Sequence, residues 1–377
     1  MPILLNTNDS SAERCPLKPS AKFRIPSIDG IRALSIALVL VGHSSSTYSH
    51  KSVWANTLLT VFGNAGLGVL IFFVISGFLI TTLLLNEYEK KGKINLADFY
   101  FRRTYRIFPA FYCYMGVVAC LWLLGAVHLS WPVFGMAAIF LRDYASLITR
   151  SHPTGDWFVG HTWTLSVEEQ FYWLWPLCLV RVKPKYAVVT ALLLVVLTPI
   201  LRTAEYLAVP KTRDLLPIML HTRMDSLMAG SLAALLYKDE RFQLVLKRLY
   251  FYKIPILAAL LTFFVFPFLG ARFRGMFYLP VGWTLENLGV VLVLLWAIDH
   301  PTSKVGLALN GRMLVHIGII SYSLYLWQQL FLTDLTAFFW NRFPLNLLFT
   351  LLAAELSYFA VEKPVLTWRN RTAAKAS

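Results

Sequence analysis

Charged residues are scarce in this chain of 377 residues, where Asp, Glu, Lys and Arg make up 15%, against about 25% in an average soluble domain. Acidic residues are the fewest, with 20 Asp and Glu against 35 Lys and Arg, so the formal net charge is +15. Hydrophobic residues reach 57% and gather in long runs. This composition excludes a soluble enzyme and a disordered basic tail. The basic excess fits a nucleic-acid surface or the cytoplasmic loops of a membrane protein.

Cysteine is also rare, and its positions do not have the spacing of a metal site. The four residues are Cys15, Cys113, Cys120 and Cys178. We expect free thiols and no bound metal. The first ~25 residues are polar and lack the short apolar core of a signal peptide, so the first span is expected to act as an uncleaved anchor.

Long apolar runs dominate the rest of the chain. Because a helix needs about 20 mostly apolar residues to cross a bilayer, the sequence predicts an all-α, polytopic membrane protein with about ten transmembrane helices. They are expected over 31–48, 65–86, 107–127, 165–181, 186–201, 217–237, 254–270, 277–299, 313–333 and 345–361, with 131–148 as a weaker candidate. We expect a polar tail over 1–24, one membrane-embedded domain over 25–369 and a basic tail over 370–377.

The positions of the basic residues follow from this topology. With ten spans both termini lie on one side, and that side holds 25 Lys and Arg. The opposite loops hold nine, among them Lys51, Arg150 and Arg202, and Arg223 falls inside a span. Positive residues concentrate in cytoplasmic loops. The bias therefore predicts cytoplasmic termini, and the charge gives no support to a nucleic-acid partner.

The first predicted span contains a pair of ionisable residues. Arg32 and His43 are three helical turns apart with a residual rotation of about 20°, so they share one face about 16 Å apart. Asp29 lies on the same side of the helix and can pair with Arg32. Ionisable residues inside a membrane mark function by default. The alternative is that Arg32 is a cytoplasmic anchor and His43 a packing residue that forms hydrogen bonds.

The second predicted span contains four small residues, Gly66, Gly68, Ser76 and Gly77. Such residues let helices approach closely inside a membrane. Helix packing is enough to explain them.

The predicted cytoplasmic loop 87–106 carries three arginines, Arg102, Arg103 and Arg106. Arginine recognises phosphate groups through paired hydrogen bonds. The cluster therefore predicts either an anchor for anionic lipid headgroups or a site for a phosphorylated cytoplasmic ligand.

Two carboxylates, Glu168 and Glu169, enter the fourth predicted span from the outer side. Neighbouring helix residues point about 100° apart, so we expect only one of them to face a small site. In the sixth span Arg223 and Asp225 are interpreted as neutralising nearby charges.

Six segments, taken in order, resemble the acyltransferase-3 family of integral-membrane acyltransferases over about residues 24–369. They are 28–34 followed by His43, 72–79, 102–109, 163–172, 320–327 and 361–364. Arg32 and His43 match the family's Arg-x10-His motif, and Trp-Thr-Leu-Ser-Val-Glu-Glu-Gln-Phe-Tyr at 163–172 is similar to its fourth-span motif. The family often has His after Leu-Trp in the ninth span, where this chain has Gln328, so no proton-transfer role is assigned there.

The resemblance implies transfer of an acyl group, usually acetyl, from cytoplasmic acyl-CoA to a glycan or other hydroxylated acceptor, in the plasma (inner) membrane of a bacterium. It also implies that Arg32 and His43 belong to the active site. Acyl-CoA is then a co-substrate, and no tightly bound cofactor is expected. Some relatives carry a fused esterase-like domain, whereas here we expect any second transfer step to need a separate extracytoplasmic protein.

A mechanism follows from the resemblance and the residues together. Acyl transfer needs a base for the acceptor hydroxyl, and histidine titrates in the right range. We expect His43 to activate the hydroxyl or to carry the acyl group briefly. Arg102, Arg103 and Arg106 are expected to bind the phosphates of CoA. Glu169, ahead of Glu168, is expected to orient His43 or a substrate hydroxyl.

Two other classes of protein stay open at this point. A proton-coupled transporter or flippase of a glycan or small hydroxylated compound could use His43 and Glu169 as a proton relay, although no inverted repeat is visible. The second class is a structural protein that binds lipid, which would give no role to His43 or to the paired glutamates Glu168 and Glu169. The acceptor is expected near the loop 128–160, because its aromatic and charged residues suit a sugar, although such residues suit an ordinary membrane interface too.

Overall fold

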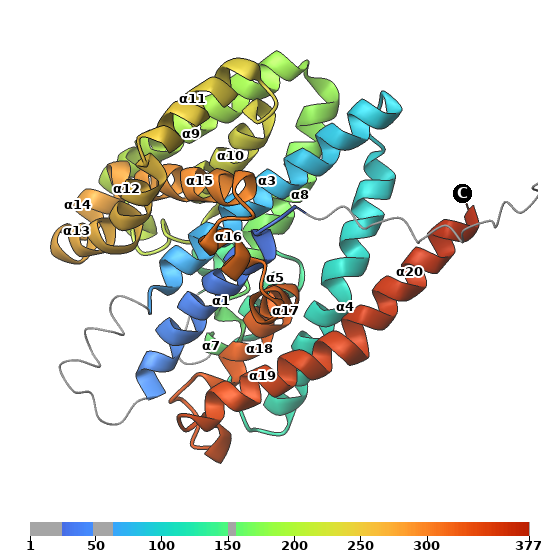
Figure 1. Cartoon of the computed structure of the whole chain (residues 1–377). Coiled ribbons are helices and arrows are strands. Elements are labelled where there is room, and N and C mark those ends of the chain that lie inside the picture. The colour runs from blue at the N-terminus through green and yellow to red at the C-terminus, as the bar shows by residue number, and fades with distance from the viewer. Residues whose placement is uncertain (1–24, 48–62, 150–155, 377) are drawn as a thin grey trace, which may run out of the picture.

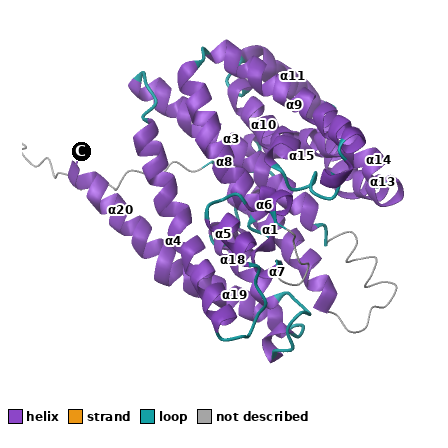
Figure 2. Ribbon diagram, turned by 180° about the vertical axis from the view of Figure 1, so that it is seen from behind, coloured by secondary structure: helices purple, strands orange, loops and turns teal. Residues whose placement is uncertain are grey.

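The computed structural model describes residues 25–47, 63–149 and 156–376, and within these ranges the chain forms helices and loops only (Figure 2). The predicted all-α class is confirmed for this part of the chain. The predicted tail 1–24 with Cys15, and the predicted outer-loop residues Lys51 and Arg150, lie outside the described residues.

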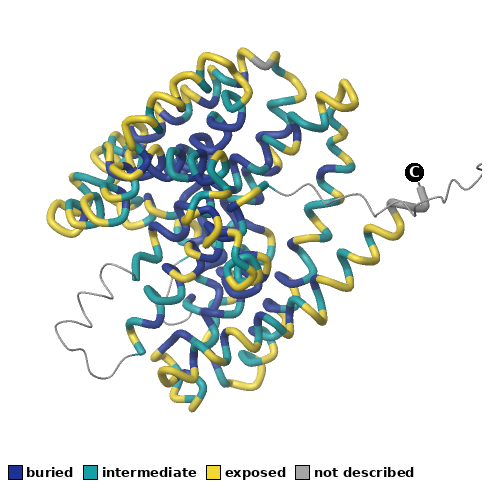
Figure 3. The backbone as a smooth tube through the Cα atoms, viewed as in Figure 1, coloured by how far each residue is buried: buried dark blue, intermediate teal, exposed yellow. Residues whose placement is uncertain are grey.

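Seven helices of the described chain are long and apolar enough to cross a membrane. They are α1 (Ile28–Ser44) with η1 (Ser45–Thr47), α3 (Ala65–Lys91), α4 (Leu96–Leu123), α9 (Pro184–Ala208), α12 (Ile254–Leu260) with η3 (Leu261–Val265) and α13 (Phe266–Phe273), α14 (Gly275–Phe277) with η4 (Tyr278–Gly282) and α15 (Trp283–Asp299), and α19 (Leu345–Ser357) with η6 (Tyr358–Glu362) and α20 (Lys363–Ala376). Exposed residues concentrate on the peripheral helices, and buried ones line the centre (Figure 3). Exposed leucines and valines along α9 suit contact with lipid.

Helices also occupy the other three predicted spans, but they are shorter or more polar. These are α8 (Trp163–Arg181), α10 (Leu220–Leu236), and α17 (Arg312–Ile319) with α18 (Ser321–Phe331). α10 has 17 residues, and Ile320 interrupts the last pair. The structure therefore supports seven spans by length and composition, and the count of ten stays a prediction. The weaker candidate 131–148 divides into α5 (Trp131–Ala138) and α6 (Arg142–Ile148).

A tight turn joins α3 to α4. Gly92 ends α3 with φ 67°, a left-handed conformation that glycine adopts without strain. The Asn95 side chain then accepts from the backbone N–H of Asp98 at 3.1 Å and caps α4. The prediction of a loop over 87–106 is therefore wrong, because α3 continues to Lys91 and α4 begins at Leu96. The three arginines lie on a helix, which fixes the directions of their side chains.

The C-terminal helix lies along α4, and Figure 1 shows α20 and α4 side by side on one flank of the bundle. Arg369 of α20 donates to the backbone carbonyl of Arg102 at 3.2 Å. The described part of the predicted basic tail 370–377 is helical, since α20 continues to Ala376. Residues with high helix propensity, Ala373 and Ala374 among them, favour this continuation.

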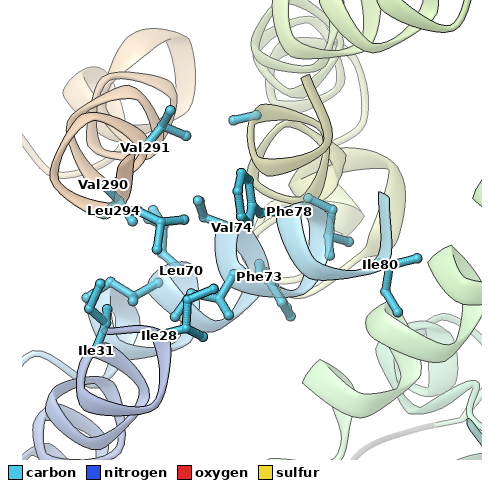
Figure 4. Packing of buried hydrophobic residues seen from close by; sticks show 14 of the residues in the cluster. Ile28, Ile31, Leu70, Phe73, Val74, Phe78, Ile80, Val290, Val291 and Leu294 are labelled. Atoms are coloured by element: carbon cyan, nitrogen blue, oxygen red, sulfur yellow. The ribbon is translucent and has the colours of Figure 1, made fainter. Parts of the chain in front are cut away.

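The centre of the bundle is an apolar layer where α1, α3 and α15 meet (Figure 4). Its residues include Ile28, Ile31, Leu70, Phe73, Val74, Phe78, Ile80, Val290, Val291 and Leu294. α3 also packs directly on α10 through two glycines. A Cβ on Gly77 would lie 1.9 Å from the Leu227 carbonyl oxygen, and one on Gly230 would lie 2.0 Å from that of Val74. The predicted close approach of the second span is therefore observed at Gly77.

Candidate active site

A chamber of about 150 Å³ lies between α1, α3, α4, α8 and α18. Its charged lining consists of five residues that the sequence singled out, Arg32, Arg103, Arg106, Glu168 and Glu169. Most of the remaining wall is apolar or aromatic, so these charges act on one another and on any ligand with little screening by water.

Both glutamates of α8 face this chamber, and the expectation that only one would do so is wrong. Ser76 Oγ donates to Glu168 Oε1 at 2.6 Å. Glu169 is 6% exposed, and its Oε1 has no hydrogen-bond partner within the described part of the chain. The expectation failed because α8 covers a wide arc of the chamber wall, with Leu165 and Tyr172 also lining it. Adjacent helical positions can then reach the same space.

The three arginines of α4 divide into two groups, because successive helical residues point about 100° apart. Arg103 and Arg106 line both the chamber and an adjoining cavity of about 380 Å³. Arg102 lines only this wider cavity. There it forms ion pairs with Asp98 and, at 3.2 Å, with Glu87. Arg103 and Arg106 therefore connect the two spaces, while nearby carboxylates already partner Arg102.

The wider cavity is strongly basic. Besides the three arginines, Lys90, Lys91 and Arg369 line it, and Glu87 is the acidic residue in its lining. Lys91 itself pairs with Glu87 at 3.2 Å. The last turns of α3, the first turns of α4 and Arg369 of α20 thus build a cationic entrance beside the chamber, a setting suited to a ligand with several negative charges.

His43 lies at the far end of α1 from Arg32 and is not among the residues that line the chamber. Its Nδ1 is 2.7 Å from Oε1 of Gln328 on α18, and Gln328 Nε2 donates to Gln329 Oε1 at 3.1 Å. Since the amide oxygen accepts, Nδ1 carries the proton and Nε2 of the neutral ring is free to accept one. Gln328 is fully buried. Gln328 therefore orients His43, a task that we expected of Glu169.

Tyr325 and Thr164 link the wall of the chamber to His161. Both line the chamber, and Thr164 Oγ1 donates to Tyr325 Oη at 2.8 Å. Tyr325 Oη donates in turn to the backbone carbonyl of His161 at 3.0 Å. His161 is buried, and its ring lies against that of Tyr325 with the ring centroids 5.5 Å apart. Hydrogen bonds through Tyr325 therefore connect the chamber wall to the backbone of His161.

The predicted acceptor-side loop 128–160 reaches His43 through Trp157, whose ring centroid is 6.1 Å from that of His43. Trp157 belongs to the short helix α7 (Trp157–Gly160), and its Nε1 donates to the Gln329 carbonyl at 3.0 Å. Asp143 of the same loop is fully buried and accepts from Gln170 Nε2 at 2.8 Å. Burial raises the pKa of Asp143 to about 6.

A second buried group of charged residues lies apart from the chamber. Arg202 was expected in an outer loop, but it lies inside α9 and is fully buried. Its Nη1 is 3.4 Å from Asp225 Oδ2, which also accepts from Thr284 at 2.7 Å. Arg223 lies 4.4 Å from the ring centroid of Trp283. Asp225 therefore neutralises a charge, as expected, and its ion-pair partner is Arg202.

Comparisons with known proteins identify two similar O-acetyltransferases. The O-acetyltransferase OatA of Staphylococcus aureus is 27% identical over 367 residues, which cover 90% of this chain and 57% of that protein. The peptidoglycan O-acetyltransferase OatA of Listeria monocytogenes is 29% identical and covers 90% of this chain and 56% of that protein. This chain thus spans little more than half the length of these relatives. No solved structure matches it.

The family can be assigned from a match over nearly the whole chain. A family model described as an acyltransferase domain matches residues 25–360. These residues include the whole chamber lining, His43 and Gln328. The chain therefore belongs to the acyltransferase-3 family, as its motifs predicted.

Proposed function

We propose that this protein is a membrane O-acetyltransferase that moves an acetyl group from acetyl-CoA to a hydroxyl of a glycan or another sugar-containing acceptor. One observation carries the proposal. Helix α1 joins Arg32, in the charged chamber, to His43, whose Nε2 is free to accept a proton. One helix thus carries both Arg32, which can attract a negatively charged donor, and His43, which can act as a base for a hydroxyl. The names of the relatives support the acetyl group.

The donor is assigned to the arginine side of the bundle. The phosphate-bearing nucleotide of CoA suits the wider basic cavity, because arginine forms paired hydrogen bonds with phosphate. The narrower chamber suits the slender arm that ends in the thioester. Glu169 Oε1, which is buried and has no partner in the described residues, can accept from an amide N–H of that arm. The bias of basic residues supports a cytoplasmic position for this side, in the plasma membrane of a bacterium.

The chemical step needs one base and one acid, and His43 serves as both. Nε2 of neutral His43 takes the proton of the acceptor hydroxyl as its oxygen attacks the thioester carbonyl. The new C–O bond forms, the C–S bond breaks, and the CoA thiolate takes the proton from the imidazolium. Gln328 keeps the proton on Nδ1, so that Nε2 stays the accepting atom. The products are the acetyl ester and free CoA.

Purified protein reconstituted in liposomes with labelled acetyl-CoA tests the proposal. We expect release of CoA thiol together with transfer of label to a hydroxylated acceptor. Passage of a glycan across the bilayer without cleavage of acetyl-CoA would instead identify a transporter or flippase and contradict the proposal. Acid quenching followed by mass spectrometry of residues 28–47 separates direct transfer, with no acetyl group on His43, from transfer through an acetyl-histidine.

A further inference from the structure

A third, larger cavity lies beyond His43, at the end of α1 away from Arg32. It measures about 800 Å³ and is bounded by Ser46 and Thr47 after α1, by 333–338 and by 341–343. Thr47 follows His43 by four residues, a rise of about 6–8 Å. Thr333 follows Gln328 by five residues and lies just beyond the end of α18 at Phe331. The floor of this cleft therefore lies about one helical turn above the hydrogen-bonded pair of His43 and Gln328.

The walls of the cleft are held in place by side-chain hydrogen bonds. Asn341 is buried, and its Nδ2 donates to the carbonyls of Leu330 and Phe331 at 3.1 and 3.0 Å. Thr336 Oγ1 donates to Asn341 Oδ1 at 2.8 Å. Asn346 donates to Thr47 Oγ1 at 2.8 Å, which joins α19 to the end of α1. These hydrogen bonds therefore hold the loop between α18 and α19 in a defined conformation.

The chemistry of the lining selects a kind of ligand. Asp334 and Arg342 are exposed in the cleft, and neither forms an ion pair or side-chain hydrogen bond with another described residue. The carboxylate can accept from hydroxyl groups and the guanidinium can donate to them. Phe338 also lines the cleft and stacks on Trp340 with ring centroids 4.7 Å apart. An aromatic face beside paired donors and acceptors suits a sugar ring, which has apolar C–H faces and hydroxyl edges.

We propose that this cleft is the acceptor site and that it binds a saccharide chain with one hydroxyl directed at His43. This inference rests on the proposed function, and it names both the acceptor's chemical class and its place. The cleft lies on the side of His43 opposite the arginine cavities, so donor and acceptor approach from opposite ends of α1. The expected acceptor loop 128–160 contributes His128 and Phe158 to a neighbouring cavity, which shares Thr336, Ala337 and Phe338 with this cleft.

Acceptor kinetics of the whole protein test this assignment. The probes are chitotriose, cellotriose and maltotriose, each titrated at saturating acetyl-CoA, with glycerol as a hydroxylated compound that is not a saccharide. We expect at least one saccharide, and not glycerol, to accelerate CoA release with saturation. Asp334→Asn and Arg342→Ala should each raise the KM for that saccharide about tenfold, because each removes a hydrogen bond to a charged group. The matched controls are Asp214→Asn and Arg272→Ala, which change exposed residues outside all the cavities described.

The outcomes separate the two proposals. If the wild-type protein releases no CoA from acetyl-CoA, the proposed function fails. If CoA is released but no saccharide accelerates it, or both cleft variants keep the wild-type KM, the cleft assignment fails alone. Hydrogen–deuterium exchange gives a second reading that does not depend on turnover. The accelerating saccharide should slow exchange in 332–344, and unchanged exchange there would overturn the assignment.

Discussion

His43 Nδ1 and Gln328 Oε1 lie 2.7 Å apart, although 285 residues separate them along the chain. The contact fixes which ring nitrogen carries the proton, and it lies between a basic chamber on one side and a polar cleft on the other. Gln328→Leu keeps the volume of the side chain but cannot accept from Nδ1. We expect kcat to fall about 10- to 100-fold, by analogy with the loss of groups that orient metal-binding histidines. The KM for acetyl-CoA should change little.

The control for Gln328→Leu is Gln243→Leu, which removes a glutamine that donates to the Tyr237 carbonyl far from His43. Steady-state kinetics of both variants in the same detergent check the expectation. If Gln328→Leu retained wild-type kcat, the orientation of His43 by Gln328 would not matter for the reaction.

The arginines of α4 should differ in their effect on the donor. Arg103→Ala and Arg106→Ala each remove a cation from the junction of the two cavities, and we expect each to raise the KM for acetyl-CoA about tenfold. Arg102 is already paired with Asp98 and Glu87, so Arg102→Ala should raise KM only about twofold. Arg248→Ala, on the exposed face of α11 (Glu240–Phe251), is the matched control. Equal effects of all four variants would argue against a phosphate site at Arg103 and Arg106.

Close packing of α3 on α10 should make Gly77 intolerant of a side chain. A Cβ there would lie 1.9 Å from the carbonyl oxygen of Leu227, and overpacking of this kind costs about 1–3 kcal/mol or more. We expect Gly77→Ala to lower the apparent unfolding temperature. Gly116→Ala is the control, because no atom lies within 4 Å of its added Cβ. A Gly77→Ala protein as stable as Gly116→Ala would contradict this packing.

Buried Asp143 should make stability depend on pH. Its pKa is raised to about 6 in the folded protein, whereas an unfolded chain has about 3.9. The folded state therefore binds this proton more tightly than the unfolded chain does. The free energy of unfolding should rise by about 1–3 kcal/mol as pH falls through 6 toward 4. Asp143→Asn cannot titrate and should lack this gain, while Asp214→Asn, at an exposed position, should keep it. Unfolding temperatures of the three proteins measured from pH 7 to pH 4.5 check the sign. Parallel curves for wild type and Asp143→Asn would refute it.

Much of the chamber was predictable because its residues belong to local patterns. Arg32, Glu168 and Glu169 stand in apolar runs, where a charge is conspicuous, and Arg103 and Arg106 stand in a dense basic cluster. The sequence also predicts that Arg32 and His43 share a helix. It did not predict that Arg102 would line only the wider cavity while Arg103 and Arg106 line both cavities. That division arises because the cluster lies on a helix, whereas a loop was expected.

The rest of the site depends on contacts between distant segments. Gln328 was noted only as a departure from the family's usual residue, and no local signal pairs it with His43. Arg202 directly follows the end of a predicted span and was therefore counted with an outer loop. Its burial depends on Asp225, which is 23 residues away along the chain, so no local pattern predicts it. The cleft above His43 is built from α1 and the α18–α19 connection, and only the folded chain brings these together.

The central claim is that His43 is the base of an acetyl transfer. The most direct test is the rate of acceptor-dependent CoA release by reconstituted His43→Ala, compared with wild type and with His316→Ala, which changes a histidine bound to Glu355 outside the chamber. Loss of a general base costs about 10²- to 10⁴-fold, so we predict a fall of at least 100-fold for His43→Ala and less than twofold for His316→Ala. A folded, membrane-inserted His43→Ala protein that acetylates at the wild-type rate would contradict the account.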